Sequence, residues 1–194
     1  MILVQQFAVA ILISACFGVG AVTGARPKGH PVHPQSRWRI YSPPDKSFRV
    51  AVPVTPHSEA EDYEGLAPSA PTVWKPTHSY MAVASILKPQ IYSISVFEVT
   101  PAGRGATDKA IDELIQELTG NNYRLTTSKQ LSVVQGRGRE FTMASKDTDD
   151  NLFTRMRFIE VGARIYMLVY VTDTADDVYS RSASRFFSSF RAEQ

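Results

Sequence analysis

Apolar and polar side chains alternate with a period of two along residues 152–159. Leu152, Thr154, Met156 and Phe158 fall on one side, and Phe153, Arg155, Arg157 and Ile159 fall on the other. This period predicts a strand with two different faces. Residues 164–171 are nearly all apolar, which is typical of a strand buried on both faces. With another strand over residues 139–145, polar turns at 146–151 and 160–163 join the three into an antiparallel meander.

Similar patterns occur earlier in the chain. Phe48, Val50 and Val52 share one face of an alternating segment. Residues 79–87 and 90–99 predict a hairpin around Lys88 and Pro89, and the second strand has bulky residues on both faces, so it is expected at the centre of a sheet. Residues 123–134 predict a further strand.

Two segments have helical periodicity. Ile111, Leu114, Ile115 and Leu118 form one apolar stripe of a helix that starts near Thr107 and ends near Gly120. A second helix starts at one of Thr172, Asp173 or Thr174, and its stripe consists of Tyr179, Ala183, Phe186, Phe187 and Phe190. Packing on the chain's own sheet is the expected role of that stripe. The elements predict an α+β fold: an antiparallel sheet of about six to eight strands packed by two main helices.

Four local motifs resemble one known family. They are YSPPDKSFRVAVP at residues 41–53, GREF at 138–141, RMRF at 155–158 with RIYML at 164–168, and RFFSSF at 185–190. Together they resemble the PsbP-like, Mog-type α/β sandwich of bacterial secreted and lipoprotein domains, over roughly residues 38–191. The resemblance implies the fold and an envelope setting. It offers no catalytic residues, and no photosystem-specific feature is present here.

The N-terminus has the character of an export signal. No charged side chain occurs before Arg26, and residues 7–13 form a short apolar core followed by small residues. Residues 1–25 are therefore expected to be a signal peptide or a lipoprotein signal. Ile13 to Cys16 has the form of a lipobox, which makes Cys16, the chain's single cysteine, a lipidation candidate. Cleavage before Arg26 and a retained membrane anchor are the alternatives. The expected location is the periplasm or cell envelope.

Residues 26–37 read as a proline-rich linker that leads into one domain over residues 38–194. Within the linker, His30 and His33 lack a fixed third ligand, so a solvated tether is a better interpretation than a metal site. Asp147, Asp149 and Asp150 lack the EF-hand pattern, so we expect a hairpin turn there and no calcium. No cofactor or metal is expected.

The composition and motifs narrow the function. The net charge is +2, which argues against a nucleic-acid partner. Gly-x-Ser-x-Gly, His-Glu-x-x-His and a nucleophilic cysteine in the mature part are all missing from the sequence. We therefore expect a non-catalytic envelope domain that binds a protein or small ligand. The alternative is an envelope hydrolase built around His57 or His78, since such sites are defined by geometry.

Basic residues supply the candidate binding site. Arg155 and Arg157 lie on one strand face, with Arg139 and Arg164 near the ends of neighbouring strands and Tyr166 interleaved. These five residues would form a basic and aromatic surface for an anionic or protein ligand. The alternative is that the arginines lie on the solvent side and pair with Glu140 and Glu160.

Overall fold

The structure is a computed structural model that describes residues 38–58, 73–85, 88–103, 105–120, 123–133, 136–147 and 151–193. These residues form ten strands, two α-helices and two short 3-10 helices. Among the described residues, neither helix is long and apolar enough to span a membrane. The predicted signal segment (residues 1–25) with Cys16, the predicted linker (26–37), and Asp149 and Asp150 lie outside the described residues.

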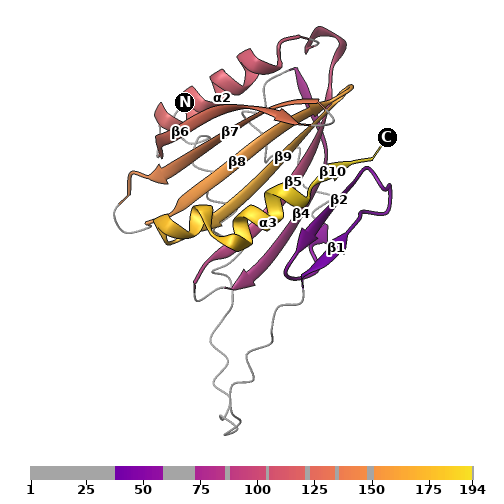
Figure 1. The fold of residues 1–194 in the computed structure, drawn as a ribbon. Helices are drawn as coiled ribbons and strands as arrows, with labels where there is room; N and C mark the ends of the chain where they lie inside the picture. Colours follow the sequence, from indigo (N-terminus) through magenta and orange to yellow (C-terminus); the bar gives the residue numbers. More distant parts are fainter. Residues whose placement is uncertain are drawn as a thin grey trace, which may run out of the picture.

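The larger sheet contains seven antiparallel strands in the order β3-β4-β5-β9-β8-β7-β6 (Figure 1). They are β3 (His57–Ser58), β4 (Trp74–Ser85), β5 (Gln90–Val99), β6 (Tyr123–Val133), β7 (Gly136–Ser145), β8 (Phe153–Val161) and β9 (Arg164–Thr172). The predicted meander is confirmed as β7-β8-β9 and the predicted hairpin as β4-β5. Gly162 makes the β8–β9 turn at φ +61°, a conformation that glycine adopts without strain.

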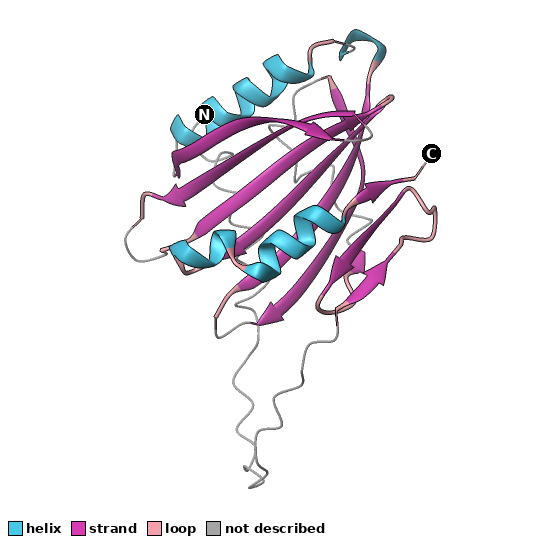
Figure 2. Ribbon diagram, viewed as in Figure 1, coloured by secondary structure: helices cyan, strands magenta, loops and turns pink. Residues whose placement is uncertain are grey.

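A smaller sheet has the order β1-β2-β10 and lies on one face of the larger sheet (Figures 1 and 2). Its strands are β1 (Arg39–Tyr41), β2 (Phe48–Val52) and β10 (Arg191–Ala192). β2 pairs with β1 on one side and with β10 on the other. The sequence did not predict β10, because a strand of two residues has no period.

The C-terminal helix covers the same face as the small sheet. The predicted single helix is in fact two: η2 (Ala175–Tyr179), a 3-10 turn, and then α3 (Arg181–Ser189). Ser180 separates them, and its side chain accepts a hydrogen bond from the Ala183 backbone N–H. Thr174, one of the three predicted caps, is the N-cap of η2 but makes no side-chain capping hydrogen bond, and Ser180 is the N-cap of α3. The predicted stripe holds from Ala183 onward, but Tyr179 is 51% exposed.

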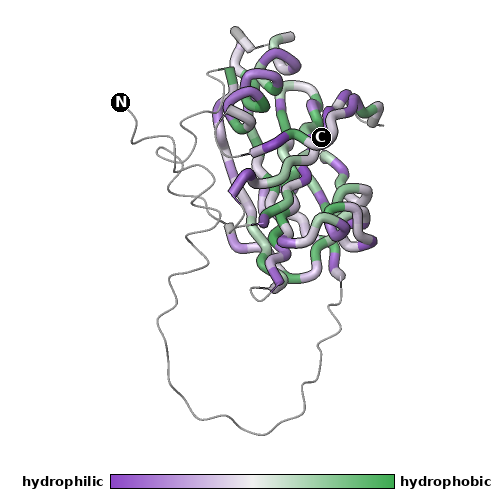
Figure 3. Tube along the Cα trace, turned by 90° about the vertical axis from the view of Figure 1, so that its left-hand side faces the viewer, coloured by the Kyte–Doolittle hydropathy of each residue, from purple (hydrophilic) through white to green (hydrophobic). Residues whose placement is uncertain are grey.

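We call the apolar layer beneath α3 and the small sheet the α3 core. Its large side chains include Phe48, Tyr92, Tyr166, Leu168, Phe186, Phe187 and Phe190. The opposite face of the larger sheet packs on α2 (Thr107–Gly120) through Ala110, Ile111 and Ile115. This α2 core also includes Trp74, Phe97, Phe141 and Phe158. Hydrophobic stretches accordingly run through the interior strands (Figure 3). The sheet is thus buried on both faces, which explains the nearly continuous burial of β5.

Candidate functional site

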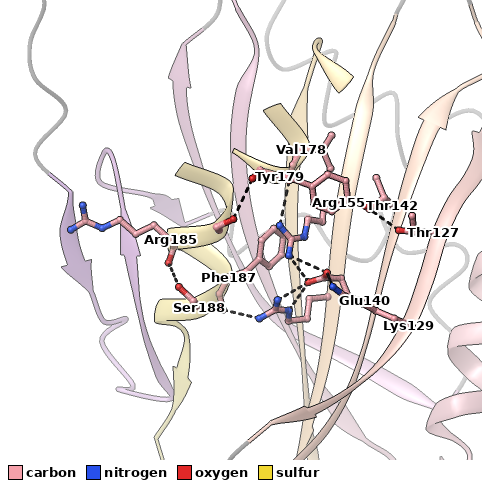
Figure 4. Close-up of polar contacts among 12 residues, drawn as sticks. Thr127, Lys129, Glu140, Thr142, Arg155, Val178, Tyr179, Arg185, Phe187 and Ser188 are labelled. Carbon is pink, nitrogen blue, oxygen red and sulfur yellow. Dashed lines mark hydrogen bonds and ion pairs between the residues drawn. The ribbon is translucent and has the colours of Figure 1, made fainter. Parts of the chain in front are cut away.

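A buried carboxylate lies at the centre of the site. Glu140 on β7 is 2% exposed, and three cations surround it on the α3 side of the sheet (Figure 4). Arg155 Nη2 lies 3.0 Å from both carboxylate oxygens, Arg157 donates from Nε and Nη2 to Oε2 at 2.9 and 2.6 Å, and Lys129 Nζ lies 2.9 Å from Oε1. We call these four residues the Glu140 cluster.

Strand register brings the cluster together. Glu140 pairs with Arg157 on β8 and with Lys129 on β6, so the three residues form one row across three strands. Arg155 lies two residues from Arg157 along β8, opposite Thr142, and so points to the same face. Residues opposite each other in antiparallel strands point to the same face, which is why charges from β6, β7 and β8 meet at one carboxylate.

The cations control the ionisation of Glu140. Burial alone would raise the pKa of Glu140, but hydrogen bonds from Lys129, Arg157 and Arg155, together with the charge of Arg157, outweigh it and hold that pKa below its ordinary value. Glu140 is therefore ionised at neutral pH. With three cations and one carboxylate, the cluster has a net charge of +2.

Both arginines also hold the C-terminal segment in place. The Arg155 guanidinium lies 4.6 Å from the Phe187 ring centroid and 5.2 Å from that of Tyr179, and its Nη1 donates to the Val178 carbonyl at 3.4 Å. Arg157 Nη1 donates to the Phe187 carbonyl at 2.9 Å. Phe187 lies in the last turn of α3, where carbonyls lack helical partners. Arg157 therefore supplies a charged cap to the end of α3.

Hydroxyl groups continue the site toward β6. The Tyr179 hydroxyl lies 2.9 Å from Thr142 Oγ1 and 3.2 Å from Thr127 Oγ1. Burial would raise the pKa of Tyr179, but these two hydrogen bonds and the charge of Arg155 lower it overall. Tyr179 therefore presents a half-exposed aromatic ring beside the positive cluster.

The five predicted site residues do not form one surface. Arg155 and Arg157 lie together, as their period-two spacing predicted. Arg139 lies on the opposite face, where it pairs with Asp112 of α2 and donates to Ser128. Arg164 is exposed at the start of β9, and Tyr166 is buried in the α3 core with its hydroxyl donating to the Ser47 carbonyl at 3.1 Å.

The alternative interpretation, pairing of the arginines with Glu140 and Glu160, is confirmed for some of them and not for Arg139, which pairs with Asp112. Arg155 and Arg157 pair with Glu140, and Arg137 Nε lies 2.7 Å from Glu160 Oε2. One part of it is wrong: Arg155 is only 7% exposed and does not lie on the solvent side. Sequence reasoning missed Lys129, Thr142 and Tyr179. Alternation along residues 123–133 was the available signal for Lys129, because it places Thr127, Lys129 and Leu131 on one face.

The two histidines within the described residues lie away from this cluster. His57 on β3 and His78 on β4 are both exposed. Across the described ranges, no three His, Cys, Asp or Glu side chains are grouped as metal ligands would be.

Comparison with known proteins identifies the architecture. No protein-family model matches the sequence, and no curated protein matches it. Among solved structures, the cyanobacterial PsbP protein CyanoP of Synechocystis aligns with TM-score 0.54 and 13% identity over 91% of this chain and 99% of its own. The chain has the PsbP-type fold. The fold expected from the sequence motifs is thereby confirmed.

Two other structures align with this PsbP-type fold at lower scores. The Ran-binding protein Mog1p of Saccharomyces cerevisiae has TM-score 0.47 and 8% identity, covering 81% of this chain and 96% of its own. LpqN of Mycobacterium tuberculosis, involved in cell envelope biogenesis, has TM-score 0.43 and 10% identity, covering 74% and 87%. At such identities the likeness concerns the fold alone.

Proposed function

We propose that this PsbP-type chain is a non-catalytic binding domain of the cell envelope. In this proposal it is exported, is held at the membrane by lipid on Cys16, and binds an acidic group of a partner protein at the Glu140 cluster. The observation that carries the binding proposal is the net charge of +2 on the cluster. An anionic partner compensates charge that Glu140 leaves unbalanced.

Lys129 is the contact point of the proposed site. Its side chain is 57% exposed, whereas those of Arg155 and Arg157 are 8% and 15% exposed. An ammonium group has three donors, and Lys129 uses one on Glu140. In the proposal, the two remaining donors bind a carboxylate of the partner protein. The half-exposed Tyr179 ring adds apolar area next to this charge, a combination common at protein interfaces.

The export proposal rests on the sequence. The uncharged segment before Arg26, the apolar residues 7–13 and the proline-rich linker form the order expected of an exported, tethered domain. No described contact favours the hydrolase alternative.

Binding of poly-L-glutamate to the full-length chain in detergent solution tests the acidic-partner proposal. Loss of one charge–charge contact costs about 1 kcal/mol near a protein surface, so Lys129→Ala should weaken binding about fivefold, and Lys129→Arg should largely restore it. Lys109→Ala is the matched control, because Lys109 is 81% exposed on α2 and pairs with Glu113. The proposal fails if Lys129→Ala and Lys109→Ala bind the probe equally well.

A further inference from the structure

The two edges of the larger sheet differ in length. At one edge lies β3, with two residues, and at the other lies β6, with eleven. Short edge strands are a common protection against unwanted pairing. β6 does not have that protection: residues 124–130 are all exposed, and no described strand pairs with its outer side.

β6 is chemically suited to receive another strand. It contains no proline, and an edge strand has backbone N–H and C=O groups that point outward. A bulge between Leu125 and Thr127 interrupts the register with β7, and the Thr126 hydroxyl donates to the Thr142 carbonyl there at 2.9 Å. From Thr127 to Val133 the register is regular. This part of the edge is a continuous template for backbone pairing.

The charges along one cross-strand row indicate what would pair there. Arg157 on β8, Glu140 on β7 and Lys129 on β6 lie opposite one another, so the row reads positive, negative, positive. The next position outward would lie about 5 Å from Lys129. A carboxylate at that position continues the alternation, whereas a cation there would be repelled.

A second copy of this chain does not fit that position through its own β6. The charged residues of β6 are Arg124 and Lys129, and it has no acidic residue. Pairing of two β6 strands would bring together only cations, whereas a partner segment with acidic residues complements the edge.

We infer that β6 receives an extended acidic segment of a partner protein as an additional strand, with a carboxylate opposite Lys129. This inference rests on the proposed function, since it assigns a backbone geometry to the same acidic partner. Main-chain hydrogen bonds would provide affinity, and the row through Glu140 would select the acidic side chain. On the same face, the neighbouring side chains of the segment would lie beside Thr127 and Leu131.

Peptide binding to the full-length chain tests the inference. The probe is an end-blocked peptide of alternating Thr and Glu with the length of β6, compared with the same peptide N-methylated at every second backbone amide, in both alternations. N-methylation removes backbone donors and keeps the charge. Only one of the two methylated forms blocks the amides that face β6, and the unmodified peptide should bind about tenfold more tightly than that form. Binding of the unmodified peptide should also slow hydrogen exchange of backbone amides in β6. A peptide of alternating Thr and Gln should bind weakly.

The outcomes separate the two proposals. Equal binding of methylated and unmodified peptides would overturn strand addition and leave the acidic binding surface in place. Binding without slower exchange in β6 would overturn it as well. If the unmodified and the methylated Thr/Glu peptides all fail to bind, the inference is wrong. If poly-L-glutamate also fails to bind, the proposed function is wrong as well.

Discussion

Glu140 shows how one residue can organise a region that apolar packing alone would not define. A buried carboxylate is tolerated only with charged hydrogen-bond partners, and here these come from β6 and β8. Through Arg155 and Arg157 the same carboxylate positions the cations that contact the end of η2 and the last turn of α3. Loss of Glu140 would therefore leave the buried Arg155 and the partly buried Arg157 without this counter-charge.

Glu140→Gln is expected to lower the free energy of unfolding at pH 7 by about 3–5 kcal/mol, the usual cost of breaking a buried ion pair from one side. The folded-state pKa of Glu140 is lowered. Its contribution is thus fully present above the unfolded value of about 4.3 and is lost as the pH falls through the folded pKa. The difference in the free energy of unfolding between the wild type and Glu140→Gln should therefore become smaller below about pH 4. Urea unfolding over a pH series measures this.

Glu113→Gln is the control for that experiment. Glu113 is exposed on α2 and pairs with Lys109 at i, i+4, so its loss should cost less than about 0.5 kcal/mol. Equal stability of the two variants would show that the Glu140 cluster does not hold the fold together.

At this scale the sequence predicted the strand face and the ion pairing but not the site as a whole. Arg155 and Arg157 follow from alternation. Arg139 could have been set apart, since it neighbours Glu140 on one strand and must point the other way. The burial of Tyr166 follows from the doubly buried strand predicted over residues 164–171, but its hydrogen bond to the Ser47 carbonyl could not be predicted, because it depends on the position of the small sheet.

Among the elements, β7 lies too close to the backbone of β8 at two glycines to accept a side chain. A Cβ at Gly138 would lie 2.7 Å from the Phe158 carbonyl oxygen, and a Cβ at Gly136 would overlap the Glu160 carbonyl oxygen. Both glycines lie at the start of β7, where it pairs with the end of β8. They leave room for the close approach of β7 and β8, two of the three strands that carry the Glu140 cluster.

Gly138→Ala should lower the free energy of unfolding by about 1–3 kcal/mol, since the strands must separate to accept the methyl group. Gly120→Ala is the control: nothing lies within 4 Å of a Cβ at that position in α2, and alanine favours helix. Thermal or urea unfolding of both variants makes the comparison. If Gly138→Ala is as stable as wild type, the close approach has no energetic importance.

The elements themselves were largely predictable, since alternation and helical stripes each follow from burial of one face. The β4-β5 hairpin, the meander and α2 lie at the predicted segments, although β4 begins at Trp74 instead of residue 79 and β7 at Gly136 instead of residue 139. The break at Ser180 was missed because Tyr179 continues the aromatic spacing of α3. In the structure Tyr179 is the last residue of η2, and α3 begins only after Ser180. β10 was missed because its two residues are defined only by their partner, β2.

For the molecule as a whole, the proposed envelope location requires an anchor, and the N-terminal sequence supplies a candidate. Cys16 is the single cysteine. A lipid-modified cysteine at the N-terminus is a sufficient membrane tether when it carries more than one acyl chain. The proline-rich residues 26–37 would then give the domain reach from the membrane surface.

Intact mass spectrometry of the chain produced from the full gene in a bacterial host, beside a Cys16→Ala variant, tests this. We expect a mature chain that begins at lipid-modified Cys16, and loss of that modification in the variant. A known lipoprotein expressed in parallel verifies that the host processes such signals. An unmodified chain that begins near Arg26 would contradict the lipid anchor but agree with export. A chain that keeps its N-terminal segment would contradict both proposals.

The pairing of β10 with β2 has a consequence for the order of folding. Residues 191–192 complete a sheet whose first strands form at residues 39–52, so that sheet cannot close until almost the whole described chain has been synthesised. Contacts between such distant segments form late and slowly. The small sheet would therefore remain incomplete, and the α3 core beneath it uncovered, during most of the chain's synthesis.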